Sequence, residues 1–313
     1  DLTSRAVFYV PDNYLMGGFP LDGSPTFTSR LPVAATDPPQ RGGIATIRAT
    51  IANADGPHDA TTTLTLKLNG GPYNRPGVPA DAATKFGGTV DAARAPTLYC
   101  PNGGTMLPPN LRRLDVQWKA KGGTNLYEIS FKSAVGEVIY YSRCDGGAPN
   151  WDAGSCAFEL DEAGYNALAY TNAGAGPVTL KIRGTVENDP TKLGEGAEFH
   201  IEFAQNSVYG GLYYWNVTQT AIMRFDFGAA TGVPDVFADH NSCVGCHALS
   251  RDGTKMVASL DGQNNGRLVF TNDVTKVNQA QTSSFTVWDN GPNRIQFASF
   301  NPTGSQFVAV YGD

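Results

Sequence analysis

Two cysteines and a histidine stand close together at Cys243, Cys246 and His247, in the motif CVGCH. Two thiols at this spacing can bond to the two vinyl groups on one edge of a haem, and the histidine that follows can then ligate the iron. Val244 and Gly245, which separate the cysteines, are small enough for a macrocycle to approach the backbone. The motif therefore predicts one covalent haem c, tethered by Cys243 and Cys246, with His247 as the proximal iron ligand.

Three other uses of the motif fit the rest of the sequence less well. A structural zinc site needs a fourth ligand and usually a second Cys/His pair at similar spacing, whereas the remaining cysteines stand apart at Cys100, Cys144 and Cys156. A redox-active dithiol opens a helix inside a βαβ unit, and no such pattern surrounds CVGCH. A disulfide across two intervening residues is strained. Haem attachment is the favoured interpretation.

Several side chains are candidates for the sixth iron ligand. Met256 follows a chain-reversing RDG turn and His240 lies three residues before the first motif cysteine, so these two are the first candidates. A place in the apolar core is the favoured alternative for Met256, and a hydrogen bond to a haem propionate is the alternative for His240. Met223 and His200 are further options, and an open sixth position is another. His58, in the turn GPHD, is expected to be solvated.

The composition favours short strands joined by turns. The chain has 36 Gly and 20 Pro, and 17% of its residues are charged. Its net charge is −6, with no run of Lys or Arg, so we expect no nucleic-acid partner. No stretch approaches ~18 consecutive apolar residues, so no transmembrane segment is predicted. The chain opens at Asp1 without an export leader, which we interpret as processing or trimming.

The strand rhythm divides the chain into three segments. Residues 1–95 predict an N-terminal β-domain or arm from the runs RAVFYV, GIATIRATIA and TTTLTLKLN, and its edge strands could pair with a second subunit. Residues 96–205 predict an antiparallel sandwich, with Trp118 as a buried anchor and Tyr165 at a tyrosine corner. Its expected strands are LDVQWKA, LYEISF, EVIYYS, CAFELDEAGYNALAY, PVTLKIRGTV and AEFHIEF.

Residues 206–313 contain a weak internal repeat. A hairpin-like pair, GGLYYWNV and AIMRFDFG, precedes CVGCH. The segment SRDGTKMVASLDG (250–262) is then echoed by NPTGSQFVAVYGD (301–313), at a separation close to the ~40–50 residues of a propeller blade. The repeat predicts propeller blades that carry the haem motif, so the whole fold is expected to be all-β.

The order of these segments resembles a known protein architecture. Residues 96–205 are similar to a fibronectin type III domain in strand rhythm and in the opening PPNL…LDVQW. GGLYYW, IMRFDFG and CVGCHALSRDGTKM, in that order, resemble exported TolB-like β-propeller proteins with a single CxxCH, which occur among myxobacteria and their relatives. The resemblance covers residues 96–313 and implies an extracytoplasmic mono-haem protein; it carries over no catalytic residue. Because a closed propeller takes ~4–8 blades, we expect the native chain to continue past Asp313.

The other cysteines fit an exported protein. Cys144 and Cys156 flank an eleven-residue loop rich in Gly and polar residues, and a disulfide between them is predicted to stabilise the fold by ~2–4 kcal/mol. Cys100 then stays unpaired, either as a small buried residue or as an alternative disulfide partner.

The leading functional hypothesis is an extracytoplasmic mono-haem cytochrome for electron transfer or redox sensing at the cell surface. One alternative is a surface binding or adhesion protein, for a polysaccharide or a partner protein, in which the haem is structural. Another is a peroxidase-like haem enzyme. No distal acid or base is recognisable near CVGCH, so an electron carrier is favoured over an enzyme; the sequence does not identify its redox partner.

Overall fold

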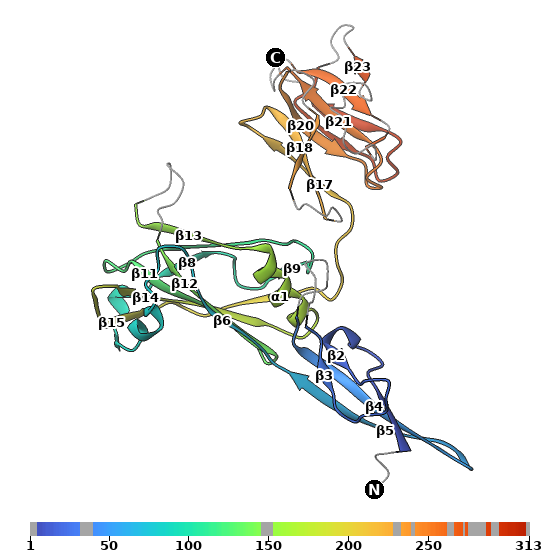
Figure 1. Cartoon of the computed structure of the whole chain (residues 1–313). Coiled ribbons are helices and arrows are strands. Elements are labelled where there is room, and N and C mark those ends of the chain that lie inside the picture. The colour runs from blue at the N-terminus through green and yellow to red at the C-terminus, as the bar shows by residue number, and fades with distance from the viewer. Residues whose placement is uncertain are drawn as a thin grey trace. The chain divides into compact units, whose positions relative to one another are not determined.

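The computed structural model describes residues 5–31, 40–144, 153–227, 233–238, 242–261, 266–271, 273–274, 286–288 and 294–310. Strands dominate these residues, which confirms the all-β class, and the α-helix in them is α1 (Glu162–Asn172). The chain forms two compact units, residues 1–208 and 209–313 (Figure 1). The predicted boundary near residue 205 lies close to the observed one, whereas no unit boundary falls near residue 95.

The larger sheet of the first unit has eight described strands. Its path runs β6–β12–β11–β14–β15–β7, and β16 pairs with both β14 and β9. The strands are β6 (Leu68–Asn74), β7 (Thr89–Val90), β9 (Thr105–Leu107), β11 (Leu126–Lys132), β12 (Gly136–Arg143), β14 (Val178–Val186), β15 (Asp189–Glu195) and β16 (Phe199–Phe203). β6 and β7 come from the segment predicted to be a separate N-terminal domain, and they join the sheet through parallel pairing with β12 and β15.

A smaller sheet packs on the larger one and closes the sandwich core. It has the order β13 (Ser155–Leu160), β10 (Leu114–Lys119) and β8 (Thr97–Cys100). Along β10, Leu114, Val116 and Trp118 are buried, while Asp115 is exposed and Gln117 is only partly buried, as the alternating sequence requires. Trp118 packs edge-on against Tyr127 of β11, with ring centroids 5.0 Å apart. The prediction of a buried Trp118 anchor is therefore confirmed.

One predicted strand is partly a helix. The run CAFELDEAGYNALAY forms β13 and then α1, whose N-terminus is capped by Asp161 through a 2.8 Å hydrogen bond from the Gly164 N–H. Tyr165, Leu168 and Ala169 are buried on one face of this helix at helical spacing. Tyr165 thus lies on a helix rather than at a corner between strands, although its hydroxyl donates to the backbone carbonyl of Pro108 at 2.6 Å.

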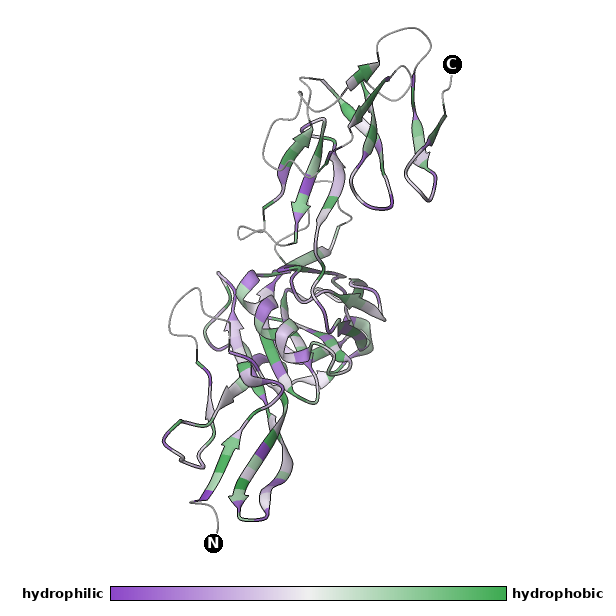
Figure 2. Ribbon diagram, turned by 90° about the vertical axis from the view of Figure 1, so that its right-hand side faces the viewer, coloured by the Kyte–Doolittle hydropathy of each residue, from purple (hydrophilic) through white to green (hydrophobic). Residues whose placement is uncertain are grey.

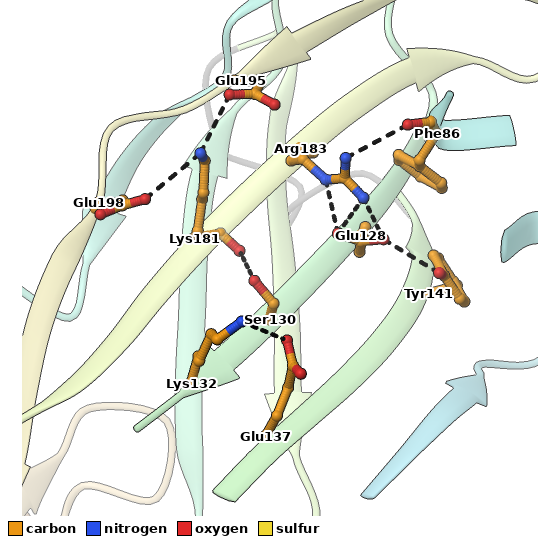
Figure 3. Close-up of polar contacts among 10 residues, drawn as sticks. All are labelled: Phe86, Glu128, Ser130, Lys132, Glu137, Tyr141, Lys181, Arg183, Glu195 and Glu198. Atoms are coloured by element: carbon orange, nitrogen blue, oxygen red, sulfur yellow. Dashed lines mark hydrogen bonds and ion pairs between the residues drawn. The ribbon is translucent and has the colours of Figure 1, made fainter. Parts of the chain in front are cut away.

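The other face of the large sheet carries a ladder of ion pairs (Figure 3). Arg183 donates from Nε and Nη2 to the two carboxylate oxygens of buried Glu128, each at 2.7 Å. The Tyr141 hydroxyl donates to the same carboxylate at 3.1 Å. Two residues along β14, Lys181 pairs with Glu195 at 3.1 Å. Cross-strand pairing in register aligns these charges across β11, β12, β14 and β15.

The remaining elements of the first unit lie in its N-terminal part. An antiparallel sheet has the order β1 (Ala6–Tyr9), β4 (Gly43–Asn53) and β5 (Gly56–Leu66), and β2 (Gly17–Gly18) pairs with β3 (Thr28–Ser29). Short 3-10 helices are η2 (Tyr14–Met16), η3 (Ala82–Phe86) and η4 (Ala92–Arg94). Hydrophobic and hydrophilic residues interleave along many of the strands (Figure 2).

The described strands of the second unit form three antiparallel sheets. The first is β17 (Gly211–Asn216), β18 (Ala221–Asp226) and β19 (Asp235–Ala238). The second is β20 (Val244–Leu249), β21 (Met256–Leu260), β22 (Arg267–Thr271) and β23 (Thr286–Trp288). The third is β24 (Phe297–Phe300) with β25 (Phe307–Val310).

The middle sheet of the second unit is covered on both faces. Every residue of β21 is buried. Met256 and Leu260 belong to one apolar cluster together with Phe237 of β19, while Val257 belongs to another that Phe300 of β24 packs against. The three sheets are therefore stacked, and the described strands close no propeller.

The internal repeat has a matching local structure in its two copies. The N–H groups of Ser250 and Asn301 each donate to a carbonyl five residues further on, at 3.0 and 2.9 Å. Gly253 and Gly304 have φ values of 69° and 65°, a conformation that favours glycine. Each turn leads into a strand, β21 or β25. The repeated sequence thus encodes one turn-and-strand geometry twice.

Candidate functional site

Four of the five CVGCH residues lie on β20, an edge strand of the middle sheet in the part of the second unit that the structure describes, and Cys243 immediately precedes this strand. Val244 pairs with Leu260, and the Cys243 carbonyl continues the ladder by accepting the Asp261 N–H at 2.8 Å. The register then shifts, so that Cys246 and His247 together lie opposite one residue of β21. Such a β-bulge redirects side chains and often marks functional positions.

Both motif cysteines are free thiols and are partly exposed. Because Cys243 and Cys246 lie along extended chain, three steps of about 3.3 Å would hold their Cα atoms roughly 10 Å apart, less any shortening at the bulge. A disulfide requires a Cα separation below about 7 Å. The strand geometry therefore keeps these two thiols available for separate bonds.

His247 is half-buried, with its Nε2 3.4 Å from the backbone carbonyl of Tyr213 on β17. Burial lowers the pKa of His247, and the contact with the Tyr213 carbonyl opposes this shift. The imidazole is therefore neutral at neutral pH, which is the form that ligates metals. Ligation through Nε2 would require the ring to turn from this carbonyl.

Two aromatic residues of β17, Tyr213 and Trp215, lie close to the motif. A side chain added at Gly245 would come within 3.9 Å of the Trp215 indole, so this glycine leaves room beside the ring. Tyr213 packs edge-on against Phe237 at 4.8 Å. Neither Trp215 nor Tyr213 was predicted to be a site residue, although the aromatic run GGLYYWNV (210–217) was a signal for both.

A cavity of about 390 Å³ lies next to Tyr213 and Leu249. Arg224 and Arg251 both line it. Arg224 forms an ion pair with Asp226 at 2.8 Å, and its guanidinium lies 5.5 Å from the centre of the Tyr213 ring. Guanidinium groups, the Asp252 carboxylate and the Tyr213 ring thus line one cavity next to Leu249 of β20.

The residue types that a covalently attached haem would need are present around β20. Cys243 and Cys246 offer two unbridged thiols, and His247 offers a neutral imidazole. Trp215 and Tyr213 offer apolar surface beside the strand. If the group is present, Cys243 and Cys246 would hold its edge and His247 its iron.

The predicted distal ligands lie in different settings. Met256 has no exposed surface and fills the core between two sheets, which is the alternative that the sequence favoured. His240 lies outside the described residues. Met223 is buried on β18, while His200 belongs to the first unit, where it contacts the Thr179 hydroxyl at 3.3 Å. His58 is exposed on β5, as expected.

The other cysteines lie in the sandwich. Cys144 and Cys156 form a disulfide with Cα atoms 4.9 Å apart, which agrees with the expected pairing. Cys100 is a free, half-buried thiol on β8, and burial raises its pKa, with a smaller contribution from Asp115.

The described ranges contain neither a cluster of metal-ligating side chains nor a membrane-spanning helix. Within the ranges given above, no group of three or more His, Cys, Asp or Glu side chains is placed to hold a metal ion. Within those same ranges, no helix has the length and apolar character needed to cross a membrane.

Comparison with known proteins gives only weak structural similarity. No protein-family model matches the sequence, and no curated protein matches it. A superoxide reductase (neelaredoxin) from Ignicoccus hospitalis is 12% identical, with 35% of this chain and 80% of that chain covered and a TM-score of 0.23. A Ca²⁺-stabilised adhesin with which an Antarctic bacterium binds ice is also 12% identical, with 74% and 52% covered and a TM-score of 0.24.

Proposed function

We propose that this chain is an extracytoplasmic mono-haem c-type cytochrome that transfers electrons or senses redox state. Cys243 and Cys246 tether the porphyrin, and His247 ligates the iron. One observation carries the proposal: a chain that contains the Cys144–Cys156 disulfide also keeps two free, partly exposed thiols, one just before β20 and one on it, directly ahead of a neutral histidine.

The cysteine states support both the compartment and the cofactor. Disulfides persist in oxidising compartments, and the Cys144–Cys156 bridge fits one. Exposed thiols are vulnerable to oxidation there, and the extended geometry of β20 disfavours a bond between Cys243 and Cys246. Two thioether bonds would use both thiols without bringing them together.

Residues of this chain would limit the exposure of the haem to water and orient its propionates. The haem supplies reversible one-electron chemistry when bound. The indole of Trp215 beside Gly245 would limit access of water to the tethered edge. Arg251, which lines the adjacent cavity together with Asp252 and the Asp226-paired Arg224, would pair with a negative propionate.

The stacked sheets support a propeller as the scaffold. Sheets packed face to face around a buried middle sheet, with a turn-and-strand repeat, are typical of successive blades. We propose that residues 209–313 are such blades, with the haem motif on the edge strand of one of them.

The test is the mass of the denatured protein from a host with active cytochrome c maturation. We expect the polypeptide plus one haem, and loss of that haem in the Cys243→Ala/Cys246→Ala variant. Cys100→Ala is the matched control and should retain it. A bare polypeptide mass for the wild type would overturn the proposal.

The role as a carrier has a separate test. A six-coordinate electron carrier resists carbon monoxide in the ferrous state and keeps low-spin spectra in both oxidation states. Rapid carbon monoxide binding with high-spin spectra would refute the carrier role and indicate a ligand-binding or enzymatic role. It would not contradict haem attachment.

A further inference from the structure

A second cavity, of about 400 Å³, lies in the first unit between β6, β12 and the first turn of α1. Its lining includes the aromatic side chains Tyr73 and Tyr140 and the charged side chains Arg75 and Asp161. Pockets for small ligands usually span about 300–1,000 Å³ and combine apolar walls with a few polar groups. The size and the lining both fall within this description.

Tyr140 is only 6% exposed, and its hydroxyl makes no hydrogen bond within the part of the chain that the structure describes. The oxygen itself is not enclosed, because it is not one of the fully buried polar atoms without a partner, so it can accept or donate to a bound molecule. The Oη atom lies against Gly164, where a Cβ would stand 2.2 Å away, and Gly164 also lines the cavity. Burial, and then the charge of Asp161, raise the pKa of Tyr140, so its hydroxyl stays a protonated donor.

Two charged groups line the cavity without an ion-pair partner in the described chain. The Arg75 guanidinium carbon lies 5.4 Å from the centre of the Phe158 ring, a cation–π contact. Asp161 accepts the Gly164 N–H through Oδ1 at 2.8 Å as the cap of α1, which leaves its second oxygen for another donor. One positive and one negative group give the site no net charge.

An exposed aromatic surface borders these polar groups. Tyr73 is half exposed, and its ring lies 5.2 Å from the ring of Tyr140. A flat ring offers an apolar platform of defined orientation. Next to it lie a hydroxyl donor, a guanidinium with several donors and a carboxylate acceptor.

We propose that this cavity binds a neutral saccharide unit. The apolar face of a pyranose ring would stack on Tyr73, and its hydroxyls would bond to Tyr140, Arg75 and Asp161. The balanced charge of the site disfavours phosphates and other anions, because sites that bind anions carry an excess of positive side chains. The site is separate from the haem motif and does not depend on the haem proposal.

The experiment is saturation-transfer difference NMR on the full chain. The probes are glucose, galactose, mannose, xylose and N-acetylglucosamine, each at about 100 mM because single sugars bind weakly. Glucuronate and glucosamine are the charged comparators. The variants are Tyr73→Ala, Arg75→Gln and Tyr140→Phe, and the matched control is Tyr99→Ala, a similarly exposed tyrosine on β8 away from the cavity.

We expect at least one neutral sugar to bind. Tyr73→Ala should weaken it by about tenfold or more, and Tyr140→Phe, which deletes one hydroxyl, by about fivefold. Tyr99→Ala should leave it unchanged. The proposal is overturned if no neutral sugar gives a signal, if the signal survives unchanged in Tyr73→Ala, or if glucuronate binds more tightly than every neutral sugar.

Discussion

Replacing Arg183 by Met should destabilise the sandwich far more than replacing Lys181 by Met. Both side chains project from β14, and each is 26% exposed. Their partners differ, because the side chain of Glu128 is 9% exposed whereas that of Glu195 is 34% exposed. Removing one partner of a buried pair leaves an uncompensated charge and costs ~3–5 kcal/mol. Exposed pairs contribute ~0–1 kcal/mol.

The partial exposure of Arg183 lets water reach Glu128 after the substitution, so we expect the lower end of that range, about 3 kcal/mol. The retained hydrogen bond from Tyr141 also limits the loss. Lys181→Met should cost less than about 1 kcal/mol. The double variant Glu128→Met/Arg183→Met should recover most of the loss, since no buried charge remains.

The assay is urea unfolding, monitored by hydrogen–deuterium exchange of peptides from β11 and β14. These peptides report the unfolding of the first unit separately from that of the second. Equal losses for Arg183→Met and Lys181→Met would refute the reasoning, because exposure of the partner would then not decide the cost. A lower free energy of unfolding for the double variant than for Arg183→Met alone would also refute the reasoning.

Three further predictions concern other parts of the chain. Cys144→Ser opens a disulfide that spans 12 positions and should cost about 3 kcal/mol in the free energy of unfolding, measured by urea denaturation; no change would contradict the loop-closure argument. A hydrogen bond from Ser250 is the main cause that lowers the pKa of Asp252 to about 2, so its contribution to stability should be present above about pH 4 and lost as the pH falls towards 2. NMR titration of that carboxyl checks this, and an ordinary pKa would refute it. Gly164→Ala should lower the melting temperature despite the better helix propensity of Ala, because its Cβ would collide with the Tyr140 hydroxyl; a higher melting temperature would contradict the close approach.

Local patterns predicted the strands of the sandwich well. LDVQWKA and LYEISF correspond to β10 and β11, because alternation records which face of a strand is buried. The helix α1 was missed, although the cap at Asp161 and the helical spacing of Tyr165, Leu168 and Ala169 signalled it. The β-rich context outweighed those signals.

Pairing between distant segments was beyond local patterns. Nothing in the sequence of β6 or β7 identifies a parallel partner, so residues 1–95 were assigned to a separate domain. At the candidate site, the sequence supplied Cys243, Cys246 and His247. The bulge at Cys246 and the position of Trp215 could not be predicted from the sequence, because both depend on how β20 pairs and packs with its neighbouring strands.

The parallel pairs of the large sheet also constrain the order in which the first unit can assemble. β6 pairs with β12, β7 with β15 and β9 with β16, and each pair joins strands roughly 70 to 100 residues apart along the chain. Because synthesis delivers the N-terminal strands first, β6, β7 and β9 must wait unpaired until their partners emerge. The sheet is complete only after Phe203 has been made, so we expect the first unit to fold late and as a whole.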